Sequence, residues 1–148
     1  MKNLSLITIS LLILTSCNQD DDYSSTDVPS IVASTFQTNF SNAKDLEWEM
    51  IGENYEADFE IDNIDHSAII NEQGELIKYK YDSQFINLPQ PLQDSLTTNY
   101  NQNQIDDVET LKIESDTYYQ LEIDQPSIDL EKVYNEDGSE NETIIYWD

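Results

Sequence analysis

The sequence is poor in the residues on which most catalytic and cofactor sites depend. It has one cysteine, one histidine, three glycines and no arginine. One thiol cannot form an intramolecular disulfide, and one cysteine with one histidine cannot supply a typical zinc site. The scattered glycines, Gly52, Gly74 and Gly138, build neither a phosphate-binding loop nor a nucleophile elbow. We therefore expect no cofactor, no metal centre and no enzymatic activity.

His66 is the only residue around which a Ser-His-Asp triad could form. The sequence offers no serine in the sharp glycine-flanked turn that such a nucleophile needs. An exposed polar residue near a turn is the simpler interpretation of His66. Calcium-binding loops of the EF-hand type fail as well, because Val133 and Ile144 fall at ligand positions in the frame around Gly138.

Positive charge is equally scarce. Six lysines stand against 31 aspartates and glutamates, which gives a formal net charge of −25 at pH 7. Such a chain repels nucleic-acid phosphates and anionic headgroups, so nucleic acid is excluded as a partner. A basic secreted or envelope protein is the partner that this charge favours. The alternative is that the acidity only keeps the protein in solution.

Long hydrophobic runs are missing except at the N-terminus, where Lys2 precedes the apolar residues 4–14. This run is too short to span a hydrocarbon core of ~30 Å, and it has the layout of a signal peptide ending at residue 16. The following Leu-Thr-Ser-Cys resembles the lipobox of bacterial lipoproteins. We therefore expect a lipid on Cys17 to attach the protein to the membrane.

Residues 17–27 are polar and acidic, which predicts a lipidated cysteine followed by a flexible tether. The acidic triplet at residues 20–22 resembles the surface-export signal of Bacteroidota lipoproteins. It predicts an outer-membrane lipoprotein exposed at the cell surface, with a periplasm-facing protein as the alternative.

Residues 28–148 follow one pattern twice. Apolar residues recur at every fourth position in two segments, which predicts amphipathic helices that begin near Pro29 and Pro89. The two stripes are Val28, Val32, Phe36 and Phe40, then Leu88, Leu92, Leu96 and Tyr100. Alternating apolar and polar residues predict antiparallel strands after each helix. They cover about residues 46–50, 55–61, 66–70 and 75–81, then 108–113, 117–123, 128–134 and 142–147.

Each half contains an Asn-Glu-X-Gly turn, ending at Gly74 or Gly138, where a hairpin needs positive φ. The predicted fold class is therefore α+β, with two tandem repeats of one helix followed by an antiparallel meander. The repeats cover about residues 28–82 and 88–147.

A proline-led helix, a strand containing Trp48, residues 55–59 (YEADF), a glycine hairpin and a second copy starting at Leu88 follow one another in this order. The arrangement resembles the PepSY-like domain of secreted Bacteroidota proteins, which is described as similar to β-lactamase-inhibitor protein. This resemblance implies helices on one face of an antiparallel sheet and a second face open to a partner. It implies no established activity, and inhibition of a peptidase or other secreted enzyme is an analogy from fold.

The candidate partner-binding face consists of residues that should point away from the helices. These are Glu47, Glu49, Glu56, Asp58, Glu60, Asp62, Tyr118 and Glu122, with Asp129 and Glu131 as less regular candidates. A merely solvated face is the alternative. The predicted function is non-catalytic binding by a lipid-anchored envelope protein that inhibits a secreted enzyme. An accessory envelope lipoprotein that binds cations or glycans is the second candidate, and the sequence does not indicate the oligomeric state.

Overall fold

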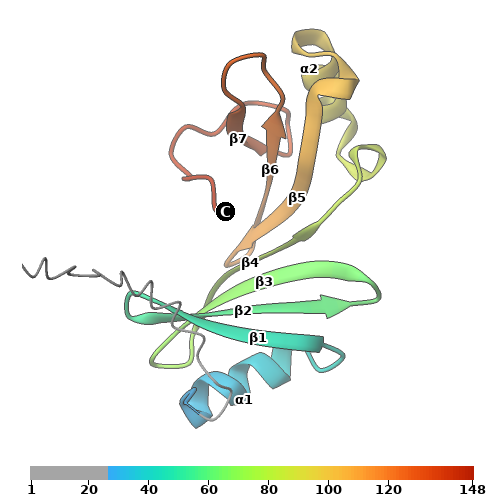
Figure 1. The fold of residues 1–148 in the computed structure, drawn as a ribbon. Coiled ribbons are helices and arrows are strands. Elements are labelled where there is room, and N and C mark those ends of the chain that lie inside the picture. The colour runs from blue at the N-terminus through green and yellow to red at the C-terminus, as the bar shows by residue number, and fades with distance from the viewer. Residues whose placement is uncertain (1–26) are drawn as a thin grey trace, which may run out of the picture.

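The computed structural model describes residues 27–148. Cys17, the acidic triplet and the predicted signal peptide lie outside the described residues. The described chain forms one seven-stranded antiparallel sheet in which each strand pairs with its neighbours in sequence (Figure 1). The strands are β1 (Lys44–Ile51), β2 (Asn54–Ile61), β3 (Ile64–Asn71), β4 (Leu76–Asp82), β5 (Ile105–Ile113), β6 (Asp116–Ile123) and β7 (Leu130–Asn135). The helices are α1 (Ser30–Asn39) and α2 (Gln90–Asn99), with short 3-10 turns η1 (Phe85–Asn87) and η2 (Gln102–Gln104).

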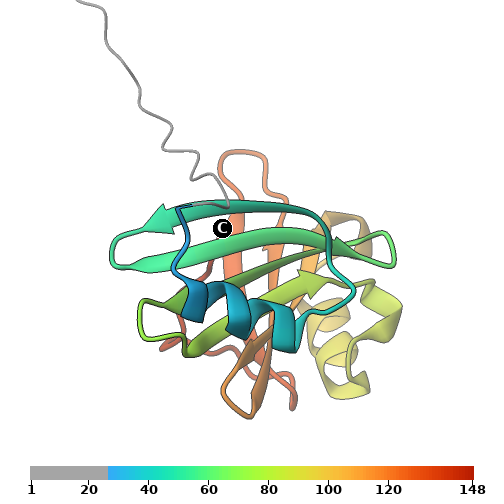
Figure 2. The same cartoon turned by 90° about the horizontal axis from the view of Figure 1, so that it is seen from below.

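Both helices cover the same face of this sheet, which we call the helix face. The helix α1 lies against β1–β4, and α2 lies at the other end of the sheet (Figure 2). Pro29 and Pro89 are the N-cap residues, so their fixed φ precedes the first helical turn as predicted. The two predicted helices and the first seven predicted strands are confirmed.

The apolar stripes of the helices pack where the pattern places them. Phe36 lies within 4.9–5.4 Å, ring centre to ring centre, of Phe40, Trp48 and Phe59, which forms an aromatic core under α1. Under α2 the core is aliphatic, with Leu92, Leu96, Leu121 and Ile123 fully or almost fully buried. The strand alternation thus turns one side of every strand toward a helix.

The two Asn-Glu-X-Gly turns also form as predicted. Gly74 and Gly138 have φ angles of +81° and +83°. Both turns approach the second residue of a helix: a Cβ on Gly74 would lie 2.6 Å from the Ile31 side chain, and one on Gly138 would lie 2.5 Å from the Pro91 carbonyl oxygen. Glycine is therefore required for contact with the helix as well as for the turn.

Three expectations were wrong. The predicted strand at residues 142–147 does not form, so the second half of the sheet has three strands. Asp62 has φ of +55° in the turn between β2 and β3, so it does not extend the strand face. His66 is half-buried in β3 rather than exposed, and its ring stacks on Phe59 at 5.2 Å between ring centres. The division into two tandem repeats of one helix followed by an antiparallel meander stays a prediction, since the first half of the sheet has four strands and the second has three.

Candidate partner-binding face

The sheet face opposite the helices, the helix-free face, brings acidic side chains into direct cross-strand pairs. Between β1 and β2 the register pairs Glu47 with Asp58 and Glu49 with Glu56. The other pairs are Glu60 with Asp65, Asp82 with Glu109, Asp106 with Glu122, and Glu122 with Glu131. Such pairs occur between all neighbouring strands except β3 and β4. Like charges opposite one another destabilise a sheet, so these acidic pairs lower the stability of the folded protein.

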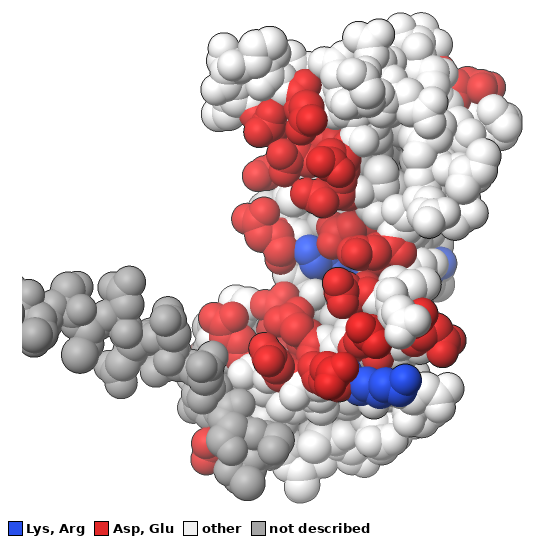
Figure 3. Space-filling view, turned by 45° about the vertical axis from the view of Figure 1, so that its right-hand side comes forward, with Lys and Arg blue, Asp and Glu red and all other residues white. Residues whose placement is uncertain are grey.

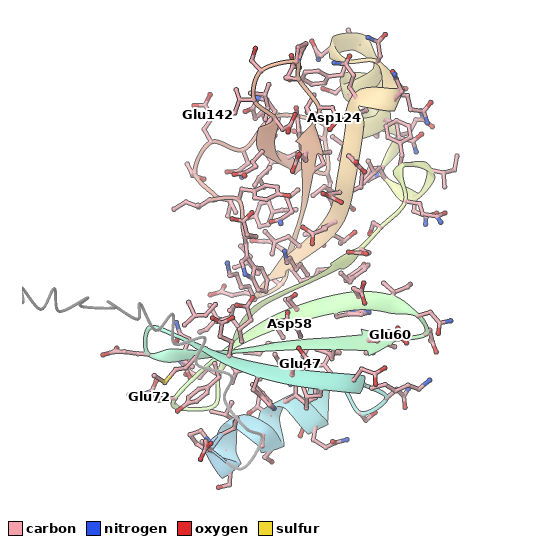
Figure 4. All side chains as sticks on the ribbon, in the orientation of Figure 1. Glu47, Asp58, Glu60, Glu72, Asp124 and Glu142 are labelled. Atoms are coloured by element: carbon pink, nitrogen blue, oxygen red, sulfur yellow. The ribbon has the colours of Figure 1, made fainter. Side chains whose placement is uncertain are left out.

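We call the exposed and half-exposed members of these pairs, other than Glu109, the acidic band. It consists of Glu47, Glu49, Asp58, Glu60, Asp65, Asp82, Asp106, Glu122 and Glu131. Acidic side chains gather in a strip along the molecule in Figure 3, with few lysines among them. Glu47, Asp58 and Glu60 lie along β1 and β2, and Asp124 lies at the other end of the sheet (Figure 4).

The carboxylates of the band affect one another's protonation. Partial burial raises the pKa of Asp82, and the nearby charges of Asp65 and Asp107 raise it further. Partial burial likewise raises the pKa of Glu122, followed by the charges of Asp129 and Asp107. The repulsion therefore extends from β3 across β4 and β5 to β6. A cationic group placed on this face would relieve it.

The middle of the helix-free face carries two lysines on β4 instead of acids. The Lys80 ammonium lies 3.1 Å from a carboxylate oxygen of Glu109, and both side chains are largely buried. Burial lowers the pKa of Lys78, while the charge of Glu56 opposes this shift. The acidic band passes these two lysines at the end of the same strand, where Asp82 lies opposite Glu109.

Residues 141–148, which we call the return segment, cover this middle. The chain's C-terminal end lies on the helix-free face, between the two halves of the sheet (Figure 1). Trp147 is buried against Ile69 and Leu111, and Tyr118 packs at the edge of this cluster. The indole N–H of Trp147 donates to a carboxylate oxygen of Glu56 at 2.9 Å. No local pattern in the sequence predicts this cluster, although Trp147 in an otherwise acidic stretch was the available signal.

The predicted partner-binding residues fall into three groups. Glu47, Glu49, Asp58, Glu60 and Glu122 share the helix-free face and reach solvent. Glu56 lies on that face but is only 7% exposed, because the return segment covers it, so its predicted exposure was wrong. Burial raises the pKa of Glu56, and the charge of Asp58 adds to this effect. Tyr118 is half-buried beside Trp147, and Asp62 lies in a turn.

Two other features of the described residues have a weaker claim to be a site. Glu122, Asp124 and Asp129 have carboxylate oxygens within 4.8 Å of one another, so they are the residues that could approach one cation. A groove of about 770 Å³ on the helix face is lined in part by Tyr81, Thr110 and Lys112. In this lining the Lys112 ammonium donates to the Thr117 hydroxyl, and the hydroxyls of Ser83 and Thr110 share a hydrogen bond of 2.7 Å.

A comparison with protein-family models and one with curated proteins gave no match. Solved structures from Bacteroides do match, each over 76% of this chain. A candidate periplasmic protein of Bacteroides eggerthii has a TM-score of 0.71 at 13% identity over 85% of its own chain. A DUF2874 family protein of Bacteroides ovatus has a TM-score of 0.68 at 17% identity over 83% of its chain.

A BLIP-like protein of Bacteroides fragilis matches with a TM-score of 0.65 at 19% identity over 82% of its chain. The chain has the BLIP-like fold. At these identities the similarity establishes the arrangement of the sheet and helices and nothing about activity. Among residues 27–148, the chain contains no helix of the length and apolarity needed to cross a bilayer.

Proposed function

We propose that this protein is a non-catalytic envelope protein that binds a basic partner protein through the acidic band. The observation that carries the proposal is the set of acid–acid pairs across neighbouring strands. Exposed carboxylates can be replaced at little cost to a fold, and pairs that repel each other can be replaced with a gain. Their concentration on the one sheet face without a helix therefore favours a function in binding.

The chemistry of the band defines the partner. A surface rich in lysine or arginine would gain charge-assisted contacts and would be steered toward the band over long range. Most of the band is solvent-exposed, so its contribution falls as salt rises, with a screening length of ~8 Å at physiological ionic strength. Inhibition of a secreted peptidase or other enzyme is the finer form of this proposal, and the BLIP-like fold supports it by analogy.

The location follows from the N-terminal sequence and belongs to the proposal. A signal peptide over residues 1–16 and a lipid on Cys17 would place the domain in the envelope, at the outer surface if residues 20–22 act as an export signal. Cys17→Ala should abolish labelling with a radioactive fatty acid. Undiminished labelling of that variant would rule out the anchor.

Affinity capture tests the binding function. Residues 20–148 are immobilised and exposed to envelope extract at low salt, then eluted with a salt gradient. A basic protein should elute at moderate salt, and it should be lost when Glu47→Gln, Asp58→Asn and Glu60→Gln are combined. The matched control combines Glu53→Gln, Glu72→Gln and Glu114→Gln, which removes the same charge from exposed positions in or beside hairpin turns. Equal capture by both variants would refute the proposal.

A cation-binding accessory lipoprotein is the second candidate function, favoured only by the carboxylates of Glu122, Asp124 and Asp129. Calorimetric titration with Ca²⁺ at physiological salt separates the two. Binding of one Ca²⁺ that Asp124→Asn and Asp129→Asn abolish would support this alternative. Absence of heat would leave the protein-binding function alone.

A further inference from the structure

The return segment is held on the sheet by few backbone contacts. Beyond β7, the Asn141 amide donates to the Val133 carbonyl at 2.7 Å. The amides of Thr143 and Ile144 then bond the Asn141 side chain, which keeps that turn local. Ile145 is 86% exposed. The segment is therefore anchored on the helix-free face by the side chain of Trp147, with Ile144 packed beside the same cluster.

Side chains of the sheet form hydrogen bonds with both the backbone amide and the backbone carbonyl of Trp147. Gln120, which is fully buried on β6, accepts from the Trp147 amide at 3.3 Å and donates to its carbonyl at 2.5 Å. The Lys80 ammonium donates to the same carbonyl at 2.8 Å. These three contacts bind the backbone amide and carbonyl of residue 147 and do not depend on its side chain.

The indole itself meets groups that suit tryptophan in particular. Its N–H donates to Glu56, which is otherwise a buried carboxylate. The Lys78 ammonium lies 4.1 Å and the Lys80 ammonium 5.1 Å from the ring centre, within range of cation–π attraction. Phenylalanine would fill the same space against Ile69 and Leu111 but would leave Glu56 without its donor.

An ordinary core patch would be built from apolar side chains, because buried charges are costly unless each is paired. This patch instead presents Glu56, Lys80 and Gln120 from three different strands toward one residue. We propose that the middle of the helix-free face is a receptor site for a peptide segment carrying tryptophan. Residues 141–148 are its resident occupant, which a segment of the same chemistry displaces.

The site is tested with a synthetic peptide of residues 141–148 added to the full chain carrying Trp147→Ala, which empties the indole position and weakens the hold of the resident segment. The peptide should bind this variant about tenfold or more tightly than it binds the natural chain, whose own segment competes at an effective concentration near millimolar. Binding should weaken at least about tenfold when the peptide tryptophan is replaced by alanine. Replacement by phenylalanine should give an intermediate affinity.

The matched control is a peptide in which the residue equivalent to Ile145 is alanine, because that side chain is exposed. It should bind like the natural peptide. On the receptor, Glu56→Ala added to the Trp147→Ala chain should weaken binding, whereas Glu60→Ala should not. Equal binding of the tryptophan and alanine peptides would overturn the proposal.

Hydrogen exchange on the natural chain gives a second test that depends on no variant. The Trp147 amide and indole N–H should exchange through a local opening, at least about tenfold faster than the amides of Ile70 and Leu121. Exchange of all four at one rate would show that the segment leaves only when the protein unfolds, which would overturn the proposal.

This inference stands apart from the proposed function. The peptide is itself acidic, with Glu142 and Asp148, so it cannot use the acidic band. Its affinity should not fall in the Glu47, Asp58 and Glu60 variant that abolishes capture of a basic partner. Failure of either experiment therefore leaves the other interpretable.

Discussion

The two faces of the sheet differ in the kind of side chain that they carry, because one is apolar and the other is mostly charged. On the helix face, the aromatic cluster under α1 and the aliphatic cluster under α2 bury almost nothing but apolar surface. On the helix-free face, carboxylates oppose one another across strands and the small core formed around Trp147 contains buried ionisable groups. The helix face thus accounts for the stability of the fold, whereas the helix-free face reduces it at its edges.

This difference indicates where function lies. Apolar packing is non-specific and is sufficient to hold seven strands and two helices together. Repelling charges and buried polar groups are not needed to hold the fold together, because apolar side chains would stabilise it at least as well. The presence of these groups on the helix-free face is best explained if that face binds a partner.

The largest expected effect separates the faces directly. Phe36→Ala should destabilise the protein by ~3–5 kcal/mol, because it leaves a cavity among Phe40, Trp48 and Phe59. Glu47→Ala, on the exposed edge of the other face, should change the free energy of unfolding by no more than ~0.5 kcal/mol. Urea denaturation of both variants measures this, and similar losses would contradict the assignment of stability to the helix face.

A smaller effect comes from the two turns that touch the helices. Gly74→Ala should cost about 1–2 kcal/mol, since alanine is strained at positive φ and the Ile31 side chain can move aside. Gly138→Ala should cost more, because the added Cβ meets the backbone of Pro91, which cannot move aside. Thermal unfolding of the pair gives the order, and a smaller loss for Gly138→Ala would contradict the contact with α2.

The helix face could be predicted because its signals are local. Four-residue spacing fixed the buried stripe of α1 from Val32 and Phe36, and strand alternation placed Trp48 and Phe59 beneath it. The same alternation placed Glu47 and Asp58 correctly on the opposite face. Local pattern thus predicted most of the sheet and the edges of the candidate site.

The middle of the helix-free face could not be predicted in this way. The weak alternation of residues 142–147 predicts a strand, but their position depends on Trp147 reaching Glu56 and Gln120, which are far away in sequence. A contact of this kind has no periodic signature. For the same reason Glu56 looked like an exposed member of an acidic row, although the return segment buries it.

The helix-free face should also make the stability of the protein depend on pH, with a smaller change than the substitutions above produce. Burial and like charges raise the pKa of Glu56, Asp82 and Glu122 in the folded protein, so the folded state binds protons more readily than the unfolded one. Stability should therefore rise as pH falls from 7 toward the ordinary glutamate value of 4.5. A falling urea midpoint over this interval would contradict the electrostatic strain on this face.

The opposite sign applies to Asp137, whose pKa is lowered by hydrogen bonds from Ser139. Its contribution is present above the ordinary aspartate value of 3.8 and is lost as pH falls below it. The stability curve should accordingly pass through a maximum on the acidic side of neutrality. Glu56→Gln should flatten the rise on the alkaline side of that maximum.

The most direct test of the account measures stability and binding in one variant. Combining Glu47→Gln, Asp58→Asn and Glu60→Gln removes the Glu47–Asp58 and Glu60–Asp65 repulsions and also the attraction between Glu60 and Lys44, at roughly 0.2–1 kcal/mol each. Two repulsions outweigh one attraction, so the free energy of unfolding should rise. The same variant should lose the basic partner captured from envelope extract, while the turn variant Glu53→Gln, Glu72→Gln and Glu114→Gln keeps it. A gain in stability with undiminished capture would show that the acidic band binds nothing, and would contradict the account.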